Sequence, residues 1–244
     1  MNKRIIRISL YFIIAAGLSL IFRIYPPAWF ENLNLPFGLT PFKGWLQGLG
    51  PLLGALIVTK FFALKRETTF WGSMRSVGLI APIAPLIMLT IIGIDIENGF
   101  NPHYYGFIMG VMILVYSIME ESGWRGYLQD ELKSFKPWLR YVIIGTLWYV
   151  WHFTFLAGEF NLLNELIVLG ILILSSWGIG KIAELTHSVA IAGYFHALGN
   201  ILFLNTIFSD NLSMGQRSLI IGICLVVWIP LINRSLKKQT SSPD

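Results

Sequence analysis

Long apolar stretches alternate with short polar connections along this chain of 244 residues. A membrane-spanning helix needs about 20 predominantly apolar residues, and eight stretches approach that length. They lie near residues 5–24, 44–64, 76–96, 104–128, 140–157, 162–182, 187–207 and 216–234. The third contains Pro82 and Pro85, which predict a kink. The pattern predicts an all-α polytopic membrane protein, a bundle of about eight transmembrane helices that forms one domain over residues 1–244.

Composition supports a membrane protein. Only 13% of the residues are charged and the mean hydropathy is +0.65, whereas a soluble globular chain carries about 25% charged residues. The single cysteine, Cys224, excludes an internal disulfide. No cluster of Lys and Arg is interleaved with aromatic residues in a polar segment, which excludes nucleic acid as a partner.

The distribution of cations predicts the topology. The first apolar stretch is followed by Pro26-Pro27 rather than by a small-residue cleavage site, so we expect an uncleaved first helix. With the N-terminus in the cytoplasm, Arg23, Lys43 and Arg217 fall on the outer side and the other Lys and Arg residues on the inner side. We therefore expect both termini to be cytoplasmic, and the compact chain favours a bacterial plasma membrane.

Two adjacent carboxylates, Glu120 and Glu121, end the apolar run at Gly106–Met119. A carboxylate at membrane depth is expensive and persists only with a partner or a task. Arg125 lies four residues after Glu121, on the same helix face, and is expected to neutralise it. Glu120 has no such local partner, so we expect it to be the reactive carboxylate. The alternative is that both glutamates only hold helices together.

Two further polar motifs stand at a similar depth. His152 lies in the fifth stretch, and His196 and Asn200 share one face of the seventh. At about 1.5 Å per residue, Glu120 and both histidines lie roughly 15 to 18 Å from the inner ends of their helices. A carboxylate, two imidazoles and an amide in a cavity open to the cytoplasm are typical of hydrolysis. Trp148, one turn before His152, is assigned to packing or substrate contact, and His103 and His187 receive no role.

The motifs also indicate a family. Glu120-Glu121-Ser-Gly-Trp-Arg125 matches an E-E-x-x-x-R motif, Trp148-x-x-x-His152 stands where F-x-x-x-H belongs, and His196-x-x-x-Asn200 matches H-x-x-x-N. In this order the chain resembles, over about residues 105–205, the CPBP family of intramembrane proteases. That family groups type II CAAX prenyl endopeptidases with bacteriocin-processing and immunity (ABI) proteins. The departure from its pattern is Trp for Phe at position 148.

The resemblance implies an endopeptidase whose site lies near the cytosolic side. It implies that Glu120 and His152 activate water, that His196 and Asn200 stabilise the oxyanion, and that Glu121 and Arg125 position the site. The expected partners are the lipid bilayer and a membrane-anchored peptide or protein substrate, such as a prenylated CAAX protein or a leader peptide. The chain's own last residues, Ser-Ser-Pro-Asp, are not a prenylation signal.

Three alternatives stay open. Zinc bound by Glu120, His152 and His196 is one, but it would need a separate base, and Arg125 occupies Glu121; a metal-free glutamate mechanism without a cofactor is therefore favoured. A non-enzymatic scaffold or bacteriocin-immunity protein is the second. A proton-coupled transporter using Glu120 as a relay is the third, and the sequence shows no internal repeat that would favour it.

Overall fold

The computed structural model describes residues 3–23, 40–96, 99–153, 156 and 160–240. Within these ranges the chain is helical and contains no named strand; a single isolated parallel bridge joins Thr69 and Ser188. The expected all-α architecture is therefore confirmed. The predicted boundary at Pro26-Pro27 lies outside the described residues.

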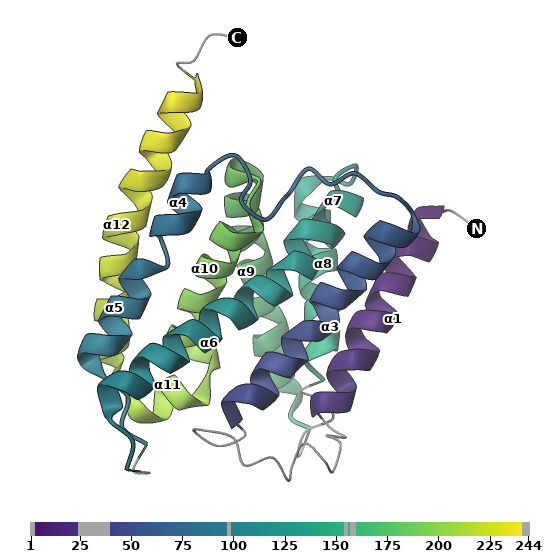
Figure 1. Cartoon of the computed structure of the whole chain (residues 1–244). Coiled ribbons are helices and arrows are strands. Elements are labelled where there is room, and N and C mark those ends of the chain that lie inside the picture. The colour runs from purple at the N-terminus through teal and green to yellow at the C-terminus, as the bar shows by residue number, and fades with distance from the viewer. Residues whose placement is uncertain (1–2, 24–39, 97–98, 154–155, 157–159, 241–244) are drawn as a thin grey trace.

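The helices follow one another in long antiparallel passes (Figure 1). Their order is α1 (Lys3–Arg23), α3 (Thr40–Phe61), α4 (Arg75–Ile80), α5 (Ile83–Ile92), α6 (Pro102–Gly123), η1 (Trp124–Leu128), α7 (Gln129–Glu131), α8 (Pro137–His152), α9 (Leu162–Thr186), α10 (Val189–Gly199), η3 (Asn200–Leu204), α11 (Thr206–Asn211) and α12 (Met214–Thr240). The elements η1 and η3 are π-helical turns.

Each of the expected apolar stretches is helical over most of its described length. Five helical segments among the described residues are long and apolar enough to cross a membrane: Lys3–Arg23, Arg75–Ile92, Pro102–Glu131, Leu162–Thr186 and Met214–Lys238. The second of these breaks between α4 and α5 at Ala81 and Pro82, as the prolines predicted. Crossing by α3, α8 and the α10–η3 segment, and hence a total of eight spans, stays a prediction.

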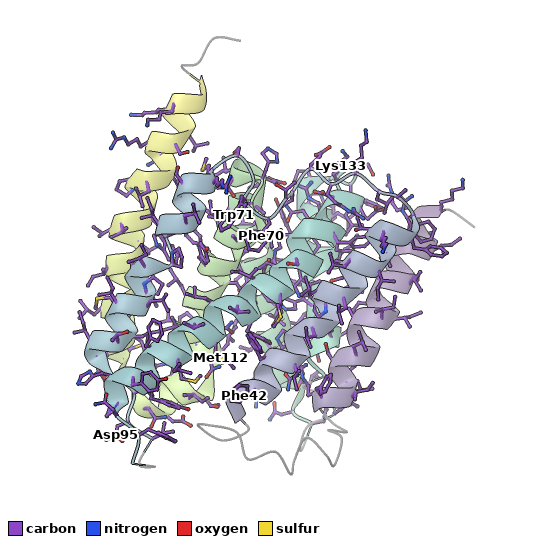
Figure 2. All side chains as sticks on the ribbon, in the orientation of Figure 1. Phe42, Phe70, Trp71, Asp95, Met112 and Lys133 are labelled. Atoms are coloured by element: carbon purple, nitrogen blue, oxygen red, sulfur yellow. The ribbon has the colours of Figure 1, made fainter. Side chains whose placement is uncertain are left out.

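Helix α6 lies at the centre of the bundle and packs against α3, α5 and α10, while α1 packs on α3 and α8 on α9. The interior holds large aromatic side chains, including Trp124, Trp148 and Trp151, each at most 1% exposed. Bulky apolar side chains such as Ile13, Leu174 and Val226 point outward, as expected for helices that face lipid. In the view of Figure 2, side chains project outward from the helices at the edges of the bundle.

The start of α1 and the end of α12 lie at the same end of the bundle (Figure 1), which we call the terminal end. Charged side chains tie this end together. Glu131 on α7 accepts hydrogen bonds from Arg7 at 2.7 Å and from Arg66 at 3.2 Å. Asp130 accepts from the backbone N–H of Thr68. These contacts fix α7, and through it the helix that carries the two glutamates.

Candidate active site

Both Glu120 and Glu121 are fully buried near the end of α6. Immediately after them, at Trp124, the α-helix widens into the π-helical turn η1, which contains Arg125. The third motif has the same architecture, because His196 is on α10 and Asn200 begins the π-helical turn η3. Short π-helical turns frequently mark functional sites. The spacing of apolar residues in the sequence did not predict the change from α-helix to π-helix at either position.

Glu121 links two of the motifs. Nη1 of Arg125 donates to Glu121 Oε1 at 2.8 Å, and both side chains are 0% exposed. The predicted i,i+4 pair is therefore present. The same Oε1 atom lies 2.8 Å from Nδ1 of His196 on α10. Since a buried carboxylate needs more than one compensating contact, Glu121 is held by both, and it in turn orients the His196 ring.

Glu120 has partners of a different kind. The indole N–H groups of Trp148 and Trp124 donate to Glu120 Oε2, at 2.8 and 3.3 Å. Tyr116, one turn earlier on α6, also interacts with this carboxylate. Oε1 of Glu120 is buried and has no hydrogen-bond partner among the described residues. One oxygen is thus anchored, and the other is free to accept from water or substrate.

His152 is the last residue of α8 and is partly buried. Its Nδ1 atom lies 2.8 Å from the backbone carbonyl oxygen of Trp148. A carbonyl can only accept, so Nδ1 carries the ring proton in the neutral imidazole and Nε2 presents its lone pair. This is the tautomer that a proton acceptor requires.

Trp148 is the centre of the arrangement. Beyond its bond to Glu120, its ring meets that of His196 edge-on at 5.0 Å and lies 5.8 Å from that of His152. The Arg125 guanidinium sits 4.8 Å from the same ring. The assignment of Trp148 to packing or substrate contact missed its hydrogen bond, although its position one turn before His152 placed it beside the site.

Asn200 is also held in place. Its Nδ2 atom donates to Ser117 Oγ at 3.2 Å, and Ser117 is fully buried on α6. Ser117, Tyr116 and Trp124 were not singled out from the sequence. The one signal was their helical spacing, since Ser117 lies four residues before Glu121 and Trp124 four residues after Glu120.

A cavity of about 570 Å³ reaches this cluster, a size usual for ligand pockets. Its polar lining residues include Arg23, Tyr116, His152, Asn200 and Asn205. Its walls are largely apolar and come from α6 and α9: Met109, Met112, Ile113, Val168, Ile171 and Leu172.

The cavity extends toward the end of the bundle away from the terminal end. Arg23 ends α1, and in Figure 2 Met112 lies low in the bundle, far from Lys133 at the terminal end. The sequence predicted a cavity open on the same side as both termini. The observed cavity lies on the other side of the glutamate–histidine cluster from the termini.

The other two histidines lie apart from this cluster. His103 is exposed in the first turn of α6, and His187 is exposed at the C-cap of α9 with a left-handed backbone.

Among the described residues no group of three or more His, Cys, Asp and Glu side chains is placed to hold a metal ion. Glu120 Oε2 is bonded to two indoles, His152 Nδ1 lies against a carbonyl and His196 Nδ1 lies against Glu121. Zinc would therefore have to bind through Glu120 Oε1 and the Nε2 atoms of the two histidines, and this alternative stays a prediction.

Comparison with known proteins agrees with the motifs. Residues 102–202 match the family model described as type II CAAX prenyl endopeptidase Rce1-like. This segment begins at α6 and ends within η3, so it contains all three motifs. The comparison with curated proteins gave no match.

Proposed function

We propose that this integral membrane protein hydrolyses peptide bonds of membrane-associated substrates through Glu120. Residues 102–202 match the family model described as type II CAAX prenyl endopeptidase Rce1-like, which supports this proposal. The observation that carries the proposal is the state of Glu120. It is 0% exposed, one carboxylate oxygen is anchored by indole N–H groups, and the other has no partner among the described side chains. A buried ionisable side chain of this kind indicates a functional role.

In the proposed mechanism Glu120 and His152 activate water. Oε1 of Glu120 accepts a proton from the attacking water, and Nε2 of His152 is available as a second acceptor. Trp148 keeps the carboxylate in place during the transfer. General acid–base catalysis by positioned groups of this type contributes about 10²- to 10⁴-fold to a rate.

His196 and Asn200 are proposed to stabilise the oxyanion. One N–H of the Asn200 amide is bonded to Ser117, and the second is available to the developing negative charge. Because Nδ1 of His196 faces Glu121, its Nε2 donates to the oxyanion in the doubly protonated form of the ring. Removing one such donor from an enzyme costs about 10²- to 10³-fold in kcat.

The cavity supports a substrate that is largely apolar and embedded in lipid. Its walls are formed largely by methionine and aliphatic side chains. Prenylated CAAX proteins and leader peptides both have this character, and the family match favours the former.

We further propose that both termini are cytoplasmic. In that orientation the cavity opens toward the outer side, whereas in the reverse orientation it opens toward the cytoplasm. Labelling of single cysteines introduced at Lys133 and at Asp210 with a membrane-impermeant maleimide decides between the two. Cys224 is buried and does not interfere. Labelling of the Asp210 site alone in intact cells supports the proposed topology, and labelling of the Lys133 site alone refutes it.

The function itself can be tested before any substrate is identified. Cells that produce the native protein or its Glu120→Gln variant at equal levels are compared by mass spectrometry of the peptide termini in their membranes. Termini that appear only with the native protein support proteolysis and identify substrates. If the variant is folded and no terminus depends on Glu120, the protein is not a protease of this kind.

A further inference from the structure

The end of α8 has fewer internal hydrogen bonds than the rest of the helix. His152 is its last residue, and the next residue, Phe153, has a left-handed backbone with φ of 54°. The last four carbonyl groups of a helix have no partner within it, and helix ends fray readily. His152, whose ring must lie near Glu120 in the proposed mechanism, therefore stands in the last turn of its helix, where carbonyl groups have no partner within the helix.

Arg23, at the end of α1, contacts this turn. Its Nη1 atom donates to the carbonyl oxygens of Trp151 at 2.9 Å and His152 at 2.5 Å. Its guanidinium also stacks on the Trp151 ring at 4.5 Å. A cation at the C-terminus of a helix interacts favourably with the helix dipole and satisfies the free carbonyls.

Two other side chains fix the positions of the Arg23 and Trp151 side chains. Gln47 on α3 accepts from Arg23 Nε at 3.1 Å. Ser19 on α1 accepts from the Trp151 indole at 2.9 Å and donates to the backbone oxygen of Gln47 at 2.7 Å. These contacts join α1, α3 and α8, and Ser19, Arg23 and Gln47 all lie outside residues 102–202, the segment that matches the family.

We propose that Arg23, supported by Ser19 and Gln47, is a positioning residue that fixes His152 for catalysis. The proposal rests on the proposed function, and it assigns to α1 and α3 a part in the site that the three motifs do not contain. It also explains why a cation stands at the end of α1. The planar fork of arginine donates to the carbonyls and to Gln47 at once while it stacks on an indole, whereas a lysine ammonium can make only part of these contacts.

The test compares Arg23→Gln, Arg23→Lys and the milder Ser19→Ala with the native protein in lipid nanodiscs. Arg140→Gln is the matched control, because Arg140 pairs with Glu184 in the first turn of the same helix, α8. Two quantities are measured. One is hydrogen exchange at the amides of Trp151, His152 and Phe153; the other is cleavage of an internally quenched farnesylated peptide that ends in a CAAX sequence.

Loss of Arg23 is expected to speed exchange at these three amides by about tenfold, since hydrogen bonds from a charged donor are removed. It should lower kcat of the folded enzyme by about 100-fold with little change in KM, because misplacement of a catalytic group acts on the transition state. Arg23→Lys should restore part of kcat, Ser19→Ala should show a smaller loss, and Arg140→Gln should change neither quantity.

The proposal is overturned if Arg23→Gln leaves the exchange at these amides unchanged, or if Arg140→Gln lowers kcat as much as Arg23→Gln does. If Arg23→Gln does not fold, Ser19→Ala and Arg23→Lys decide by the same two measurements. If the native protein does not cleave the peptide while the exchange changes as expected, the proposed activity on this substrate fails and the helix-end contact stands.

Discussion

Replacement of Trp148 by Phe introduces the residue that the family motif has at this position and removes one hydrogen-bond donor from Glu120. The indole Nε1 donates to Glu120 Oε2 at 2.8 Å, with Trp148 1% and Glu120 0% exposed. The phenyl ring fills most of the same space and keeps the edge-on contact with His196. The variant therefore tests the contribution of this one bond.

The size of the effect follows from the charge of the acceptor. A hydrogen bond to a charged group contributes about 1.5–3 kcal/mol to stability, and one between neutral groups about 0.5–1.5 kcal/mol. Trp228 provides the neutral reference. It is 1% exposed, and its Nε1 donates at 2.8 Å to the carbonyl oxygen of Ala81, which is not a residue of the site.

Both variants leave a similar cavity, so the difference between them isolates the charged acceptor. We expect Trp148→Phe to reduce the free energy of unfolding by about 1 kcal/mol more than Trp228→Phe does. It should also lower kcat/KM by about tenfold, which corresponds to 1.4 kcal/mol, because Glu120 loses its shorter anchor. Trp228→Phe should leave kcat/KM unchanged.

Unfolding is followed in mixed micelles of increasing denaturing-detergent content, and kcat/KM is measured with the farnesylated CAAX peptide. If Trp148→Phe is as stable as Trp228→Phe and cleaves the peptide as fast as the native protein, the indole does not anchor Glu120.

Three further predictions concern packing, charge and metal. A Cβ atom at Gly193 would lie 2.8 Å from Ile118 Cγ1 and 2.9 Å from its Cα, so Gly193→Ala should push α10 away from α6, reduce stability by about 1–3 kcal/mol and lower activity. A Cβ atom at Gly170 meets nothing within 4 Å, so Gly170→Ala should reduce neither stability nor activity. Equal losses in the two variants would contradict this prediction. Lys133 holds the pKa of Glu67 below its usual value by a hydrogen bond and its charge. Such a carboxyl adds stability above its unfolded pKa and loses it as the pH falls through the folded pKa, so Lys133→Gln should raise the Glu67 pKa in an NMR titration, and an unchanged titration would show that the pair does not form. Protein that has been freed of metal by a strong chelator should cleave the peptide at the same rate as untreated protein. Activity that is lost on this treatment and returns only with added zinc would refute a glutamate mechanism.

Much of the fold could be predicted from the sequence, because a long run of apolar residues in a chain of this composition is typical of a membrane-spanning helix. The apolar stretches are helical, and the break at Pro82 lies where a proline removes a helical hydrogen bond. The pairing of Glu121 with Arg125 also followed from helix geometry alone. These features depend on residues close together in the chain.

The contacts between helices could not be obtained in this way. Nothing in the local sequence indicates that Glu121 faces His196 or that Trp148 bonds to Glu120, because each contact depends on how two helices rotate against one another. The π-helical turns that begin at Trp124 and Asn200 shift the register of the following residues, and apolar periodicity does not reveal them. The position of the cavity depends on both effects.

The most direct test of the account is the rate of peptide cleavage by the Glu120→Gln variant. The amide preserves the shape of the side chain and abolishes its ability to accept a proton from water. With purified protein in nanodiscs and the farnesylated CAAX peptide, kcat should fall by about 10²- to 10⁴-fold, while the exposed Glu67→Gln control stays at the native rate. A folded Glu120→Gln variant that cleaves the peptide as fast as this control would contradict the account.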